Sequence, residues 1–194
     1  MSEFKMFCYQ CQETAMNKGC SMKQGVCGKT AEVACLQDLF IWVLKGISVY
    51  AEKAKEHGWY EEPTAFFVCK GLFTTITNAD FNRNSFIRMI GEGVKLRENI
   101  KQFCEGKIIF KDLPECAVWK PENESDIIKK AGEGAGGWLK IENEDIRALK
   151  SLVLYGLKGI SAYLEHGWQI KHNAQEIFEF LFEGLSAVEQ INDA

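Results

Sequence analysis

The sequence predicts an all-α protein in which a Cys-rich, cluster-binding loop at the N-terminus precedes two copies of an antiparallel helical bundle. The 194 residues include only three prolines, so long helices can run without interruption. In several segments apolar residues recur at every third or fourth position, which is typical of a helix with one buried face. One stretch of the chain also occurs twice, and this repeat indicates that the bundle is duplicated.

The first bundle is expected over residues 31–105 and holds three helices. Thr30 suits the N-cap of a long helix that ends at Gly58, because glycine readily adopts the left-handed conformation that closes helices. A second helix is expected to begin near Pro63, a residue that suits the first helical turn. The apolar pattern predicts a third helix over residues 82–103, which completes a three-helix bundle.

Residues 106–142 differ in composition from the segments on either side. They contain two prolines, a glycine-rich run at residues 132–137 and two short apolar runs. Such a stretch is typical of a connection between helical units, so we expect a linker with short extended pieces.

A second bundle is expected over residues 143–194, beginning with Asn143 as the N-cap. The repeat supports it, because Leu-Lys-Gly-Ile-Ser at residues 44–48 returns at residues 157–161. The second copy is expected to hold only two helices, since no counterpart of the third helix follows. The mid-helix glycines of the repeat, Gly46 and Gly159, are expected to mark close helix crossings.

The last predicted helix has an apolar face that the second bundle alone does not cover. Either this face packs on the first bundle, or a partner covers it. We therefore expect a homodimer or a hetero-complex that forms through the side chains of this face, namely Phe178, Leu181, Phe182 and Leu185.

Four of the eight cysteines are Cys8, Cys11, Cys20 and Cys27, which fall within the segment of residues 1–30. Their Cys-x2-Cys-x8-Cys-x6-Cys spacing lies on a glycine-punctuated loop, as expected of a ligand set. A zinc site would usually pair two Cys-x2-Cys units, whereas an iron–sulfur cluster tolerates uneven spacing. The spacing favours an iron–sulfur cluster and leaves zinc, or unliganded or disulfide chemistry, as alternatives.

The remaining cysteines and the histidines are interpreted without a metal. Free cysteine is one of the most buried residue types. We therefore expect the other four cysteines to be small core residues, namely Cys35, Cys69, Cys104 and Cys116. This expectation is weakest for Cys35. We interpret the three histidines as polar residues at helix ends, namely His57, His166 and His172. No nucleophile–base pair stands out, so the sequence predicts no catalytic residue.

Charge and composition exclude several classes of partner. A net charge of −4 without a basic stripe argues against nucleic acid as a partner. The longest apolar run, residues 39–44, is far shorter than the roughly 20 residues of a membrane span, so none is expected. The N-terminus also lacks the pattern of a secretory signal, so we expect a cytoplasmic protein.

The motifs of the N-terminal half resemble those of the hybrid cluster protein (hydroxylamine reductase) family. The run Phe-Cys-Tyr-Gln-Cys-Gln-Glu-Thr-Ala at residues 7–15 carries this resemblance, together with Gly-Val-Cys-Gly-Lys-Thr at residues 25–30. It continues through residues 72–81, 143–149 and 155–160, which means that it covers nearly the whole chain. The first domain of this family is helical with two bundles, in agreement with the repeat.

The resemblance implies a [4Fe–4S] cluster held by Cys8, Cys11, Cys20 and Cys27. A more widely spaced variant of the family carries [2Fe–2S] instead. In complete members this cluster passes electrons to a hybrid iron–sulfur–oxygen cluster, whose ligands lie in later domains. This chain has no matching motifs for those ligands, so whether it is an enzyme by itself stays open.

The resemblance thus implies a single-cluster electron-transfer module that serves a redox protein partner or the missing catalytic domains. One alternative is a fragment or subunit of an active hydroxylamine or nitric oxide reductase. A structural metal-binding or sensory protein, in which the metal only folds the loop, is another alternative.

Overall fold

The computed structural model describes residues 4–11, 13–76, 79–172 and 174–190, and in this part of the chain the protein is all-α, as predicted. A single backbone bridge between Cys8 and Cys20 is the only β-type pairing there. Two 3₁₀ turns, Ala15–Asn17 and Trp138–Lys140, accompany the α-helices, which are α1 (Ala31–Lys55), α2 (Glu62–Thr74), α3 (Arg83–Cys104), α4 (Glu115–Val118), α5 (Glu124–Gly132), α6 (Glu144–Gln169) and α7 (Gln175–Gln190).

Helix α1 forms the centre of the molecule. Thr30 caps it as predicted, because its hydroxyl accepts a hydrogen bond from the Val33 amide at 3.3 Å. By length and composition α1 could cross a membrane, but 94% of its most apolar window is buried inside the protein. Burial in the core therefore accounts for its apolar composition.

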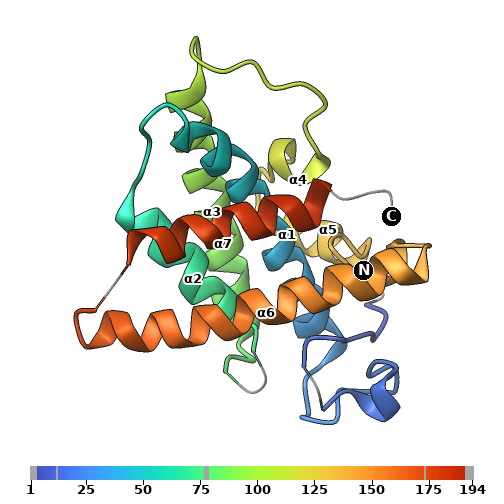
Figure 1. Cartoon of the computed structure of the whole chain (residues 1–194). Coiled ribbons are helices and arrows are strands. Elements are labelled where there is room, and N and C mark those ends of the chain that lie inside the picture. The colour runs from blue at the N-terminus through green and yellow to red at the C-terminus, as the bar shows by residue number, and fades with distance from the viewer. Residues whose placement is uncertain (1–3, 12, 77–78, 173, 191–194) are drawn as a thin grey trace.

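The two helical copies share one hydrophobic core. Helix α1 packs against α3 and α7, while α2 packs mainly against α6. Aromatic pairs join the copies: the rings of Phe66 and Trp168 stack with centroids 4.4 Å apart, and Trp59 lies 6.0 Å from Phe182. Figure 1 shows α6 and α7 crossing the front of the bundle, with α1 and α3 behind them.

This arrangement corrects the predicted docking surface on the last helix. The side chains Phe178, Leu181, Phe182 and Leu185 are at most 3% exposed, because α7 packs on the first copy. They are therefore not exposed to a partner chain in this fold. Of the two outcomes that the sequence allowed for this face, packing on the first bundle is the correct one.

Helix crossings repeat between the two copies. A Cβ atom added at Gly71 of α2 would lie 2.9 Å from a Leu44 methyl group of α1. At the equivalent Gly184 of α7, the added Cβ would lie 2.6 Å from a methyl group of Leu157, which is the counterpart of Leu44. The same glycine–leucine crossing therefore brings together α1 with α2 and α6 with α7, as expected of a duplicated unit.

The segment expected as a linker with short extended pieces is partly helical. It contains α4, α5 and the second 3₁₀ turn, and it buries Cys116, Ile127 and Trp138. Helix α4 lies directly on α1, because a Cβ atom at Gly46 would be only 2.1 Å from the Cys116 carbonyl oxygen. Of the two short apolar runs, residues 117–119 overlap α4, which packs on α1, whereas residues 108–110 are not helical.

Glycines at equivalent positions of the repeat have different surroundings in the two copies. Gly58 follows α1 with a φ of +79°, as expected of a helix end. At its counterpart Gly167 the helix does not end, because α6 continues to Gln169. Gly46 marks a close crossing, whereas a Cβ atom at Gly159 would meet nothing within 4 Å. In the described part of the chain, α6 therefore lacks neighbours that α1 possesses.

Candidate metal centre

The four cysteines of the N-terminal loop are brought together by backbone pairing. Cys8 and Cys20 exchange two hydrogen bonds, with nitrogen–oxygen distances of 3.0 and 2.9 Å, which join two distant parts of the loop. A tight turn follows, in which the amide of Gly28 donates to the Gly25 carbonyl at 2.9 Å. Gly28 has a φ of +87°, a conformation that glycine adopts without strain.

One small cavity is lined by all four predicted ligands, Cys8, Cys11, Cys20 and Cys27. Cys8 and Cys20 are buried, while Cys11 and Cys27 are half-buried, and none of them forms a disulfide. Among the residues that the structure describes, no three His, Cys, Asp or Glu side chains converge closely enough to hold a single metal ion. Four thiols around one space are chemically suited to a multi-iron cluster, which needs ligands from several sides.

Two polar side chains donate hydrogen bonds toward these sulfur atoms. The Lys29 Nζ lies 3.4 Å from the Cys8 Sγ and also donates to the Gln37 Oε1 at 2.5 Å. The Thr14 hydroxyl lies 3.9 Å from the Cys20 Sγ and donates to the Cys8 carbonyl at 3.1 Å. Donors of this kind stabilise sulfur atoms that carry negative charge, as they do in thiolates and clusters.

The two buried thiols respond differently to this environment. Burial raises the pKa of Cys8 above its ordinary value, although the charge of Lys29 opposes the shift. Burial also raises the pKa of Cys20, but backbone hydrogen bonds at Val26 and Ala15 outweigh it, so the pKa is lowered overall. Cys20 is therefore the more readily deprotonated of the two, which suits a metal ligand.

A buried polar network fastens the loop to both helical copies. The side-chain amide of Gln10 donates to Asp38 on α1 and accepts from Lys158 on α6. Next to it, the Tyr155 hydroxyl donates to the Tyr9 carbonyl at 2.7 Å. Burial raises the pKa of Asp38 and lowers that of Lys158, and the two charges partly compensate one another through their attraction.

The sequence pattern did not predict this network. Asp38 and Lys158 interrupt the apolar faces of two long helices, and that position is the signal that could have revealed them. A charged residue among core positions needs a polar partner, because an unpaired buried charge is costly. The partner is Gln10, which the sequence places between two predicted ligand cysteines without indicating which direction its side chain takes.

The other cysteines lie away from the cavity. Cys69, Cys104 and Cys116 are buried in the main core, as predicted for small apolar residues. Cys35 is half-buried, and its thiol lies 3.6 Å from the Lys5 carbonyl oxygen. The three histidines are exposed.

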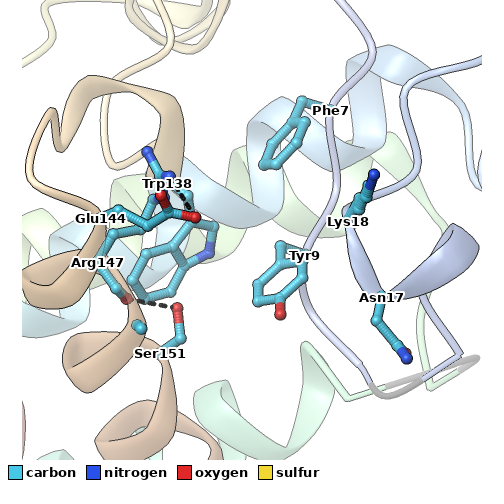
Figure 2. A pocket seen from close by; sticks show the side chains of 9 residues that line it. Phe7, Tyr9, Asn17, Lys18, Trp138, Glu144, Arg147 and Ser151 are labelled. Atoms are coloured by element: carbon cyan, nitrogen blue, oxygen red, sulfur yellow. Dashed lines mark hydrogen bonds and ion pairs between the residues drawn. The ribbon is translucent and has the colours of Figure 1, made fainter.

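A larger cavity of about 370 Å³ lies beside the cysteine loop. Figure 2 shows Phe7, Tyr9 and Lys18 of the loop facing Trp138 and Arg147 across it. None of the four predicted ligand cysteines lines this cavity. It lies between the loop and the start of α6, and two hydrogen bonds join the loop to that helix farther along, at Tyr155 and Lys158.

Comparison with known proteins identifies the family. The model of the Prismane/CO dehydrogenase family matches residues 6–193. The chain belongs to this family. Among its relatives, a hydroxylamine reductase from Halothermothrix orenii is 48% identical over 189 residues, which cover 94% of this chain and 34% of the relative.

Other relatives show the same relationship in length. Hydroxylamine reductases from Desulfitobacterium hafniense and Bacteroides thetaiotaomicron are 43% and 45% identical, covering 94% and 93% of this chain. The matched regions are 33% and 32% of those two proteins. This chain therefore spans about a third of the length of the curated relatives that it matches.

Proposed function

We propose that this chain is a single-cluster electron-transfer module that binds one [4Fe–4S] cluster through Cys8, Cys11, Cys20 and Cys27. The observation that carries the proposal is the common cavity that these four cysteines line. Membership of the Prismane/CO dehydrogenase family supports an iron–sulfur cluster over the zinc alternative. When bound, the cluster supplies one-electron oxidation and reduction at a site near the protein surface.

The residues of the chain hold and tune this site. Lys29 and Thr14 direct donors at the sulfurs of Cys8 and Cys20, and such hydrogen bonds raise the reduction potential of a cluster. Gln10, held from both sides by Asp38 and Lys158, fixes the backbone between Cys8 and Cys11.

The electron acceptor in this proposal is a hydroxylamine-reducing centre on another domain or partner. Reduction of hydroxylamine to ammonia consumes two electrons and two protons and releases water, so a one-electron module must deliver electrons singly. The names of the relatives support this substrate, and the module would act in the reducing cytoplasm.

Metal analysis on anaerobically purified protein tests the proposal. We expect about four iron and four sulfide per chain, no zinc, and one paramagnetic signal after reduction. Cys8→Ser should lose this cluster, whereas Cys104→Ser, which alters a buried thiol outside the cavity, should retain it. Stoichiometric zinc in place of iron, or no metal after reconstitution, would refute the redox function.

The same pair of variants separates electron transfer from a structural role. Circular dichroism of cluster-free Cys8→Ser should retain the helical signal, because the main core is formed without the loop. Loss of the helical fold together with the cluster would favour a metal that serves only to fold the protein. Distinctly more than four iron per chain would indicate a second cluster.

A further inference from the structure

One face of α6 is exposed although it is apolar. Leu149 is 54% exposed, Leu152 68%, and Tyr163 84%. Val153 is 41% exposed, and between these side chains Gly156 faces open space. We call this set, residues 149, 152, 153, 156 and 163, the α6 face. Side chains of this size on one helix face are unusual at a free protein surface.

The internal repeat identifies what such a face does in the first copy. The counterparts of the α6 face lie 113 residues earlier on α1, where Leu36, Leu39, Phe40 and Val43 are completely buried and Tyr50 is 1% exposed. The same positions are therefore core in one copy and surface in the other. Because the glycine–leucine crossing at Gly71 is repeated at Gly184, we attribute this difference to what covers the two faces.

Helix α3 and the segment after it cover the face of α1. The rings of Phe40 and Phe86 lie 6.0 Å apart, and a Cβ atom added at Gly93 would be 2.9 Å from Val43. After α3, Phe110 packs on Tyr50 with ring centroids 4.8 Å apart. Within the described residues no equivalent of α3 covers α6.

A neighbouring aromatic residue extends the exposed face. Phe67 of α2 packs edge-on against Phe40, with ring centroids 6.0 Å apart. Its counterpart on α7, Phe180, is 49% exposed. The second copy therefore presents the same two-helix surface that receives α3 in the first copy. It differs in having Gly156 where α1 has Val43, which leaves room for a larger side chain from the occupant.

We propose that the α6 face binds an amphipathic helix that lies on α6 as α3 lies on α1, and that this helix belongs to the part of the protein that the longer relatives possess. The chain covers only 34% of the Halothermothrix orenii relative, so about two thirds of such a protein could supply the occupant. Its apolar face carries a large residue opposite Gly156 and its outer face is polar. The proposal goes beyond electron transfer, since it concerns a surface and not the cluster.

Binding to the rest of the relative tests this surface directly. The full chain is mixed with a polypeptide comprising the remaining two thirds of the Halothermothrix orenii reductase, and the complex is sized by light scattering. We expect a one-to-one complex, and the double variant Leu152→Gln/Val153→Gln should weaken it by at least about 100-fold. Ile109→Gln, at a residue outside the α6 face that is 89% exposed, is the matched control and should bind like the parent chain.

Several results would overturn the proposal. These are the absence of a complex, a complex that the double variant does not weaken, or self-association of the chain that the double variant abolishes. The last result would assign the face to a second copy of this chain. Neither complex formation nor self-association depends on iron. A negative result would therefore not contradict the electron-transfer proposal.

A second measurement does not depend on folding of the isolated remainder. In a chimera, residues 6–193 of this chain replace the matched region of the Halothermothrix orenii relative. The Tyr163→Cys variant is then reacted with a thiol reagent, both in this chimera and in the chain alone. We expect at least about tenfold slower reaction in the chimera, whereas Ile109→Cys should react equally in both. Equal rates at residue 163 would show that nothing covers the α6 face.

Discussion

A pair of alanine substitutions at repeat-related glycines tests how differently the two copies are packed. Gly46 and Gly159 occupy the same position of the repeated Leu-Lys-Gly-Ile-Ser motif, both inside long helices. Alanine stabilises a helix interior relative to glycine by up to about 1 kcal/mol. Gly159→Ala should therefore raise the free energy of unfolding by about this amount, since the added Cβ meets nothing within 4 Å.

The same substitution at Gly46 should have the opposite effect. Its Cβ would lie 2.1 Å from the Cys116 carbonyl oxygen, so α4 must move away from α1. Overpacking of this kind costs about 1–3 kcal/mol. Movement of α4 also weakens the 2.7 Å hydrogen bond from the buried Arg97 guanidinium to that carbonyl, worth about 1.5–3 kcal/mol because the donor is charged.

These contributions give a net loss of about 2–5 kcal/mol for Gly46→Ala once the helix-propensity gain is subtracted. For a protein of this size, Tm should fall by roughly 5–15 °C, while Gly159→Ala should raise it by about 2–4 °C. Thermal unfolding followed by circular dichroism measures both. Equal shifts of the same sign at the two positions would refute the reasoning, because the repeat would then be packed alike in both copies.

The remaining predictions use single side chains with matched controls. Tyr50→Phe should raise the free energy of unfolding by about 1 kcal/mol, because the buried Tyr50 hydroxyl has no hydrogen-bond partner, while exposed Tyr163→Phe should change nothing. Arg97→Met should lower the free energy of unfolding, measured in urea, by about 3 kcal/mol, because it removes a fully buried guanidinium that donates to the Cys116 carbonyl. The control Arg88→Met, at an exposed residue, should change the free energy of unfolding by no more than about 0.5 kcal/mol. Lys158→Met should leave Gln10 without its donor and speed proteolysis of the cysteine loop, and unchanged cleavage rates would mean that the network does not hold the loop.

The sequence by itself determined the helical class, the duplication and the cysteine set of the loop. These features depend on local patterns: helical spacing of apolar residues, capping by Thr30 and Asn143, and the spacing of Cys8, Cys11, Cys20 and Cys27. Each pattern acts over a few residues or a single helical face, so it can be interpreted without knowledge of distant neighbours.

Only the tertiary structure decided how the two copies meet. The repeat predicts similar helices, but it does not reveal that α7 packs on α1 and buries Phe178, while the α6 face stays exposed. It also does not reveal that Gln10 joins Asp38 and Lys158, since hydrogen bonds between residues far apart in the chain leave no periodic signal. Equivalent positions thus have the same local preferences, and their burial depends on which distant segment lies against them.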